Sequence, residues 1–296
     1  MSATIPIATA RRATIRAPRL DVRRARLGVV LLAGVALAGC ETVATRGPAQ
    51  QVAVLERQDS AVTGTNIASL TEVIRNNPDD ATAYNTRGAA YARVGDFREA
   101  LADFSKAIEL DPQNAAAYTN RALALRQTGR DDEALADFTR ALAADPNYAP
   151  ARIGRANLLR ARGNTTAALA DLNEALRVNP ESPEAHHARG LVYQRLGQHR
   201  EAVLDFDAAI DRNPYVAAPY QGRGQSLIAL GDYEKAIEDL NASLNVNAQN
   251  ADAWAWRGVA LERSGQVDEA RESYRRALSI DASNTIAREG AGRVRA

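Results

Sequence analysis

A unit of 34 residues repeats six times without a gap, and this period constrains the fold more than any other feature of the chain. The fifteenth residue of every unit is glycine and the twentieth is alanine. The glycines are Gly95, Gly129, Gly163, Gly197, Gly231 and Gly265. A repeat of this length is typical of stacked helical or strand units, each of which buries its apolar face against the next. Because such stacks form extended surfaces, the period favours a binding protein over an enzyme.

Each unit is predicted to contain two helices. In the first unit Tyr84, Gly88 and Tyr91 recur at the spacing of one helical face. Gly95 then ends this helix, since glycine accepts the left-handed conformation of a C-terminal cap. A second apolar stripe follows and stops before Pro112, because proline cannot continue a helix. The unit is therefore a helix, a tight turn, a second helix and a short connection.

This pattern resembles the tetratricopeptide repeat (TPR). The first unit carries the family's residues at Tyr84, Gly88, Tyr91, Ala100, Phe104, Ala107 and Pro112. The resemblance covers residues 81–284 and implies an all-α fold, a right-handed α-solenoid of helix-turn-helix repeats. The six units are 81–114, 115–148, 149–182, 183–216, 217–250 and 251–284. We expect a preceding helix within 66–80 and a polar capping helix over 285–296.

Two units depart from the pattern at position 4, and two at the closing proline. Arg152 and His186 stand where the family usually has an aromatic residue, and Ala248 and Ala282 stand where the other units have proline. These substitutions affect the expected local packing but not the predicted fold.

An arginine ladder accompanies the repeat. Position 7 is arginine in all six units, and position 23 is aspartate in the first five and Ser273 in the sixth. The two positions fall at similar heights on antiparallel helices, so we predict Arg–Asp pairs. The pairs could lie within one unit or between neighbouring units, and the alternative is that both side chains are solvated. In either arrangement the ladder is architectural rather than a functional site.

The first forty residues are of a different kind. Residues 1–26 contain seven arginines and one acidic residue, and Leu27–Ala38 is an apolar run. This run is too short to span a bilayer but typical of the hydrophobic region of a secretory signal. It ends in Leu37-Ala38-Gly39-Cys40, which resembles the lipobox of bacterial lipoproteins. The resemblance implies a signal peptide, residues 1–39, that is removed, and lipid on Cys40, including palmitate-type acyl chains. An organellar transit peptide is the alternative, and the apolar block argues against it.

Removal of this leader changes the charge of the chain. Residues 1–39 hold seven of the 37 Lys and Arg and one of the 36 Asp and Glu, which leaves a formal net charge of −5. A mildly acidic protein is not an expected nucleic-acid partner. Residues 40–65 have little large apolar content and are predicted to be a lipidated tether. Glu41 differs from the aspartate that retains some lipoproteins in the inner membrane. We therefore expect a lipid-anchored protein that faces the periplasm, at the outer rather than the inner membrane.

The resemblance also nominates a binding surface. In TPR proteins the concave groove is lined by positions 2, 5, 9, 12 and 13 of each first helix, and Trp256 falls near the same face. The predicted partner-binding residues are Asn85, Arg93, Thr119, Arg126, Gln127, Asn157, Arg160, His187, Gln194, Arg195, Gln221, Gln225, Trp256 and Arg263. Arginine in a groove suits carboxylates and peptide backbones, whereas the alternative is an ordinary solvated face. The set does not reproduce the Lys/Asn/Arg clamp of chaperone-binding TPR domains.

No catalytic constellation stands out in the sequence. His186 and His187 are adjacent and cannot share a helix face, and neither they nor His199 has ligand partners at metal-binding spacing. The glycines belong to turns and helix contacts rather than to a phosphate-binding loop. We therefore predict no enzyme activity, no metal and no cofactor.

Two functions fit these observations. The first is a membrane-anchored scaffold that recruits proteins or peptides through the groove, with partners such as cell-wall hydrolases, proteases or assembly factors. The alternative is a structural subunit of an envelope secretion, pilus or outer-membrane assembly complex. Obligate interfaces are large and apolar, so a polar groove favours the scaffold. A carrier of a glycan or another non-protein ligand is a third possibility, supported only by Trp256.

Overall fold

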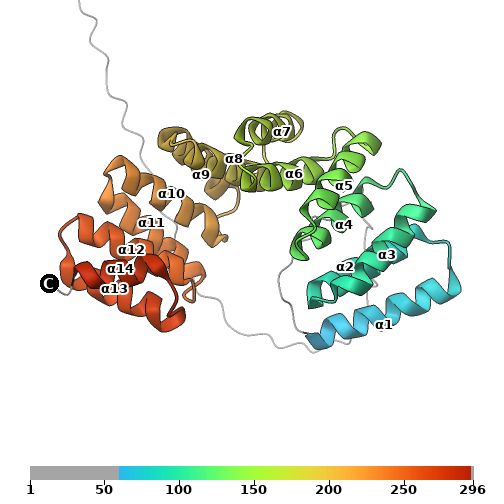
Figure 1. The fold of residues 1–296 in the computed structure, drawn as a ribbon, viewed down its shortest axis with the longest axis horizontal. Helices are drawn as coiled ribbons and strands as arrows, with labels where there is room; N and C mark the ends of the chain where they lie inside the picture. The colour runs from blue at the N-terminus through green and yellow to red at the C-terminus, as the bar shows by residue number, and fades with distance from the viewer. Residues whose placement is uncertain (1–59, 295–296) are drawn as a thin grey trace, which may run out of the picture. The chain divides into compact units, whose positions relative to one another are not determined.

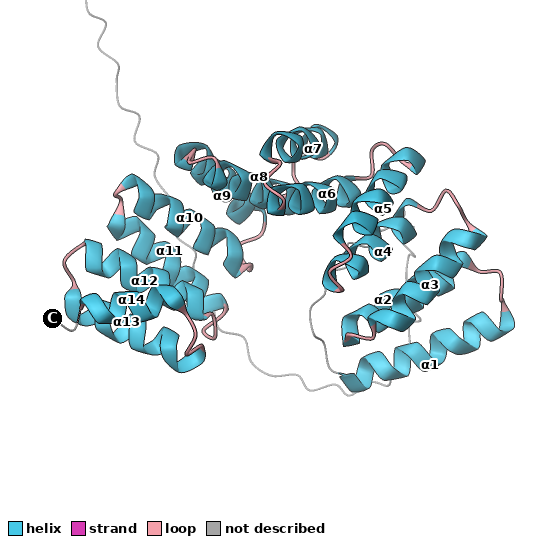
Figure 2. Ribbon diagram, in the orientation of Figure 1, coloured by secondary structure: helices cyan, strands magenta, loops and turns pink. Residues whose placement is uncertain are grey.

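The protein is an array of helices over the residues that a computed structural model describes, 60–294 (Figures 1 and 2). No strand occurs in this range. The helices are α1 (Ser60–Asn76), α2 (Ala81–Val94), α3 (Phe97–Leu110), α4 (Ala115–Gln127), α5 (Asp131–Ala144), α6 (Ala149–Ala161), α7 (Thr165–Val178), α8 (Pro183–Arg195), α9 (His199–Arg212), α10 (Ala217–Leu230), α11 (Tyr233–Val246), α12 (Ala251–Arg263), α13 (Val267–Ile280) and α14 (Thr285–Arg293). The predicted all-α solenoid fold is confirmed. The predicted signal peptide, Cys40 and the tether up to residue 59 lie outside the described residues.

The two flanking helices differ slightly from the sequence expectation. Helix α1 begins at Ser60 rather than at Asn66, and it runs through Gly64. A glycine inside a helix costs only about 0.5–1 kcal/mol relative to alanine, which is too little to stop a helix by itself. At the other end α14 packs against both α12 and α13, and its Arg288 and Glu289 are exposed.

Glycine at position 15 ends the first helix of every unit. All six of these glycines have a positive φ, between 72° and 90°. Side chains with a Cβ resist this left-handed conformation, so the repeat requires glycine there. The following helix then begins within one or two residues, as α3 does at Phe97.

Small residues on the first helices make room for large residues on the second helices. Phe206 of α9 fills the space over Gly190 and Gly222, where an added Cβ would lie only 2.8 Å and 2.6 Å from its ring. Gly190 belongs to the same unit as Phe206, and Gly222 belongs to the next. Phe138 and Gly154 form a similar contact between α5 and α6. One buried ring thus packs within and between repeats, which is why glycine is needed at these positions.

The arginine ladder forms, and each arginine bonds to its own unit and to the preceding one. Arg121 donates from Nε and Nη2 to both carboxylate oxygens of Asp137, at 2.6 Å and 2.9 Å, and from Nη1 to Ser105 at 3.0 Å. The same bidentate pairs join Arg87 to Asp103, Arg155 to Asp171, Arg189 to Asp205 and Arg223 to Asp239. The predicted Arg–Asp pairing is confirmed for five units. The question of its register is answered as well, because the carboxylate lies within the unit and the third bond crosses the boundary.

The residues that depart from the family at position 4 make a shared contact. Arg152 donates to the carbonyl of Pro146, and a ring nitrogen of His186 lies 3.0 Å from the carbonyl of Pro180. Trp254, an aromatic residue at the same position, donates to the carbonyl of Ala248 at 2.9 Å. The nitrogen groups of arginine and histidine thus bond at the connection between units as an indole does.

The backbones of first helices in neighbouring units approach each other closely, whereas those of neighbouring second helices do not among residues 60–294. Contacts link α2 to α4, α4 to α6, α6 to α8, α8 to α10 and α10 to α12. The repeats are therefore packed more tightly on the side of the first helices, and these helices form one continuous surface.

Candidate functional site

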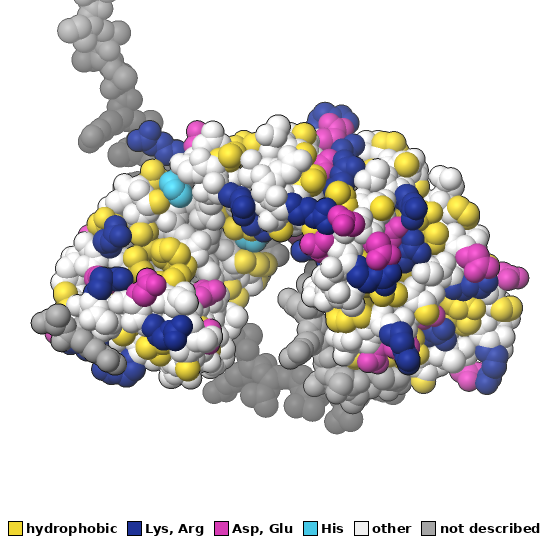
Figure 3. All heavy atoms as spheres, viewed as in Figure 1, with side chains coloured by type: hydrophobic (Ala, Val, Ile, Leu, Met, Phe, Trp, Pro, Cys, Tyr) yellow, Lys and Arg dark blue, Asp and Glu magenta, His cyan; other side chains and the backbone are white. Residues whose placement is uncertain are grey.

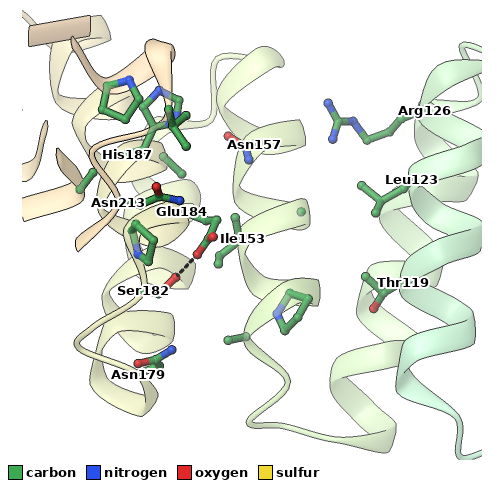
Figure 4. Close-up of a pocket in the computed structure, with 18 of the residues that line it drawn as sticks. Thr119, Leu123, Arg126, Ile153, Asn157, Asn179, Ser182, Glu184, His187 and Asn213 are labelled. Carbon is green, nitrogen blue, oxygen red and sulfur yellow. Dashed lines mark hydrogen bonds between the residues drawn. The ribbon is translucent and has the colours of Figure 1, made fainter. Parts of the chain in front are cut away.

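A pocket of about 320 Å³ opens among α4, α6, α8 and the start of α10, and we call it the central pocket. Figure 4 shows Thr119, Leu123 and Arg126 on one helix, Ile153 and Asn157 on the next, and His187 on the third. Most of its wall is apolar, and its larger apolar side chains are Leu123, Pro150, Ile153, Pro183, Val216 and Pro219. Its size is at the lower end of ligand pockets, which span about 300–1,000 Å³.

His187 lies in the wall of this pocket and is uncharged at neutral pH. Burial, together with the positive charge of Arg160, lowers the pKa of His187 from 6.5 to about 4. Its ring is tilted against the ring of Phe206, with 5.8 Å between the centroids. The neighbouring His186 faces the ladder instead, where Nδ1 lies 3.0 Å from Asp205. Two adjacent histidines therefore lie in different surroundings, as the sequence predicted.

Three arginines without carboxylate partners lie on successive first helices, and the first of them is in the wall of the central pocket. Arg126 lies in its wall, Arg160 lies close enough to affect His187, and Arg195 follows on α8. None of the three forms an ion pair or a side-chain hydrogen bond within residues 60–294. Burial, with Arg195 and Arg126 nearby, lowers the pKa of the Arg160 guanidinium. The Nε atom of Arg160 is buried and has no hydrogen-bond partner.

A second and more open depression lies towards the C-terminal repeats. Its lining includes the predicted residues Gln194, Arg195, Gln225, Trp256 and Arg263. Trp256 is only partly exposed and packs against the core cluster of the last repeats. Its indole therefore contributes to packing as well as to the surface.

Four of the polar residues predicted for the groove bond within the fold. Buried Asn85 accepts a hydrogen bond from Asn120, and buried Thr119 donates to the carbonyl of Ala115. Gln194 donates to the carbonyl of Gly222 in the next unit, and Gln221 accepts from Asn250, the last residue of its own unit. The bonds of Asn85 and Gln194 join neighbouring units.

The remaining predicted residues fall into two groups. Arg93 and Gln127 lie at the C-terminal ends of α2 and α4, outside the lining of both cavities. Asn157 lies in the central pocket, and its amide has no bonding partner in the described part of the chain. The prediction of a polar groove was incomplete, because it omitted the apolar wall. Leu123, Pro150 and Ile153 occupy groove positions 9, 2 and 5, so the same register applied to apolar residues finds them.

Elsewhere on the surface, basic and acidic side chains are interspersed, as Figure 3 shows for one face. Many form exposed pairs, such as Lys235 with Asp232 and Arg130 with Glu133. From residue 60 to residue 294, no group of three or more His, Cys, Asp or Glu is placed to hold a metal ion. None of the helices in that range is long and apolar enough to cross a membrane.

The repeats define the family of the chain. Sequence profiles of the tetratricopeptide repeat match residues 85–149, 183–215 and 222–285, and a TPR repeat profile matches residues 156–197. These matches together cover more than half of the chain, and the protein belongs to the tetratricopeptide-repeat family. No curated protein sequence matches it.

Solved structures share the fold. A chain of the APC/C hetero-tetramer Cut9-Hcn1 aligns with a TM-score of 0.73 and 20% identity over 78% of this chain and 46% of that chain. This protein thus spans less than half the length of that relative. PilW, a widely conserved type IV pilus biogenesis factor, aligns with a TM-score of 0.64 and 19% identity over 71% of this chain and 97% of its own. At these identities the likeness is one of fold.

A third structure is that of YrrB, a TPR protein with an unusual peptide-binding site. It aligns with a TM-score of 0.51 and 25% identity over 64% of this chain and 97% of its own. A TPR surface that binds a peptide is thus known in a protein similar to this one.

Proposed function

We propose that this protein is a non-enzymatic scaffold that is anchored by lipid to a bacterial envelope membrane and recruits protein partners through its first helices. The central pocket is the observation that carries the proposal. It is formed by helices of four repeats, and it combines an apolar wall with Arg126 and Asn157, whose side chains have no bonding partner in the described part of the chain. Protein-binding sites commonly place apolar anchors beside unpaired polar groups in this way.

The lipid anchor would keep the scaffold and its bound partners at the membrane. Two or three lipid chains on Cys40 hold a protein stably at a membrane, whereas one chain binds only marginally. A tethered platform raises the effective concentration of one bound partner for another. The sequence supports this part of the proposal through the Leu37-Ala38-Gly39-Cys40 motif, and Glu41 supports the outer membrane, facing the periplasm.

In-cell photo-crosslinking tests the scaffold role. Wild-type protein should capture several envelope proteins, and Asn157→Trp should lose them because the indole fills the central pocket. This variant removes no hydrogen bond of the folded protein, and its thermal melting shows whether the fold is kept. Capture that persists unchanged in a folded Asn157→Trp protein would place the binding surface elsewhere and contradict the proposal.

A separate variant tests the anchor. Cys40→Ser should release the protein from the membrane fraction and abolish incorporation of labelled fatty acid. Separation of inner and outer membranes on a density gradient then checks the predicted location. Full membrane retention of Cys40→Ser without lipid label would contradict the lipid anchor and leave the groove proposal standing.

The second candidate is a structural subunit of an envelope assembly, and the likeness to the pilus biogenesis factor PilW motivates it. It predicts capture of one fixed set of proteins in constant proportion. The crosslinking experiment separates the two, because a scaffold exchanges partners and a permanent subunit does not.

A further inference from the structure

The arginines next to the central pocket differ from the ladder arginines of the first five units. Each ladder arginine of the first five units is satisfied by a buried aspartate. Arg126, Arg160 and Arg195 lie five or six residues after a ladder arginine on α4, α6 and α8, and they have no such partner among the described residues. The chain thus supplies carboxylates for one row of cations and none for the other.

This second row is electrostatically unfavourable as it stands. Arg160 is partly buried between two like charges, and its Nε donor is unsatisfied. A buried donor without a partner and a repulsion between cations both cost free energy. An anion bound between the guanidinium groups removes the repulsion between the cations. The arrangement therefore points to a negatively charged ligand.

The same row begins at an apolar cavity, so we expect a ligand with both an anionic group and an apolar group. Arg126 is itself part of the pocket wall, and Arg160 acts on His187 in that wall. Because His187 is neutral, the charged side chains in the pocket wall are Arg126 and Glu184, and Glu184 accepts a hydrogen bond from Ser182 at 3.0 Å. An anionic group held by the arginines brings the atoms next to it into an apolar space of about 320 Å³.

A free amide distinguishes a peptide from a lipid as the ligand. A fatty acid also has a carboxylate beside an apolar chain, but it offers nothing further to a hydrogen-bonding group. Asn157 presents a donor and an acceptor inside the pocket with no partner among residues 60–294. Leaving both unpaired under a bound acyl chain would cost free energy, whereas a peptide group satisfies both.

We propose that Arg126, Arg160 and Arg195 bind an acidic residue of a partner peptide while the large apolar side chain beside it enters the central pocket. This inference rests on the proposed scaffold role and specifies what the scaffold recognises. Asn157 bonds to the peptide backbone between the two side chains. The recognised feature is an aspartate, a glutamate or a C-terminal carboxylate next to a large apolar residue.

Selection from a random peptide library tests the proposal. Peptides of about twelve residues, which extend to roughly 40 Å, are displayed and selected on the full-length protein. The same selection is run on a pocket variant, Arg126→Gln/Arg160→Gln/Arg195→Gln. A control variant, Arg200→Gln/Arg276→Gln/Arg288→Gln, loses the same charge at exposed positions elsewhere.

The wild type and the control should enrich peptides with an acidic residue beside a large apolar one, and the pocket variant should not. For an enriched peptide, replacing the acid by its amide should weaken binding at least tenfold by fluorescence anisotropy, since a charge-assisted bond typically contributes about 1.5–3 kcal/mol. Replacing the apolar residue by serine should weaken binding by a similar factor. Binding should also weaken between about 0.1 M and 1 M salt.

Three results would overturn the inference. They are enriched peptides without acidic residues, equal binding by the pocket variant, and binding of laurate at the arginines with no peptide enriched. The crosslinking experiment with Asn157→Trp separates this failure from failure of the scaffold role. Partners captured through the pocket, together with peptides that lack acids, would disprove the acidic ligand and keep the scaffold.

Discussion

Two rows of arginine run along the first helices, and they have opposite relations to the rest of the chain. The ladder row, represented by Arg121 and Arg155, is fixed by bidentate bonds to buried aspartates. The pocket row, Arg126, Arg160 and Arg195, comes next on the same helices and is left without counter-charges among the described residues. Arginines at one position of the repeat thus stabilise the fold, and those five or six residues later are available to bind a ligand. Residue type alone does not reveal which role an arginine has.

Breaking the ladder should have the largest effect. Asp137→Ala removes the carboxylate that holds Arg121, and the guanidinium is then partly buried without a counter-charge. Loss of one partner of a buried pair costs about 3–5 kcal/mol, so urea unfolding should show a large loss of stability. Asp132→Ala, on the same helix but in an exposed pair with Arg162, is the control and should change little. Equal effects of the two variants would contradict the assignment of the ladder as architecture.

The free energy of unfolding should depend on pH through His187, which lies beside Arg160 of the pocket row. The pKa of this side chain is about 4 in the folded protein and 6.5 ordinarily. Between these two pH values the imidazole is protonated in the unfolded chain and neutral in the folded protein. Stability should therefore fall as the pH decreases from about 6.5 to about 4, by on the order of 3 kcal/mol at most. His187→Asn should remove this part of the dependence. The difference in unfolding free energy between the two proteins, measured across that range, isolates the contribution of His187. A constant difference would show that the folded protein accepts the proton.

The sixth unit allows the ladder to be completed. Its Arg257 bonds to Asn241 and Ser273, and burial without a carboxylate partner lowers the pKa of the guanidinium. Ser273→Asp places the acid of the other units opposite this arginine and should raise stability by about 1 kcal/mol. Ser273→Asn is the matched control without the charge. If thermal unfolding shows the asparagine variant to be as stable as the aspartate variant, the carboxylate itself contributes nothing.

The smallest effect on stability is expected in the pocket row. Arg160→Gln removes a guanidinium that has no partner and lies between like charges, so stability should stay within about 1 kcal/mol or rise slightly. Arg155→Gln, five residues earlier, breaks a bidentate pair and should be strongly destabilising. Urea unfolding of the two variants compares the rows directly. Similar losses would mean that Arg160 is also architectural.

Much of the architecture could be predicted from the repeat because its constraints recur in every unit. Glycine with a positive φ and a buried alanine at position 20 each have one steric cause, repeated six times. The register of the ladder could not be predicted. Each ladder arginine has bonding partners sixteen residues away in both directions, and sequence does not reveal that both are used.

The central pocket was harder to predict because the groove was searched for polar residues, and the apolar residues at the same positions were left out. Leu123 and Ile153 occupy groove positions but are of the type that usually fills a core. Val216 comes from the connection between units, where the repeat constrains side chains least, and Pro219 from the first turn of α10. Trp256 illustrates the opposite case, since its indole packs partly against the core cluster. Which apolar residues stay uncovered depends on how neighbouring helices fit, and a one-dimensional pattern does not contain that information.

Each ladder arginine bonds in both directions along the chain, and this affects how the number of repeats can change. Arg121 bonds sixteen residues forward to Asp137 and sixteen residues back to Ser105. Arg189 does the same with Asp205 and Asn173. Gene duplication or deletion of a whole 34-residue unit recreates both contacts at the new junction, whereas an insertion between positions 7 and 23 changes the sixteen-residue spacing of an arginine from its acid. Whole repeats can therefore be gained or lost without loss of the ladder, and each change would alter how many first helices the binding surface contains.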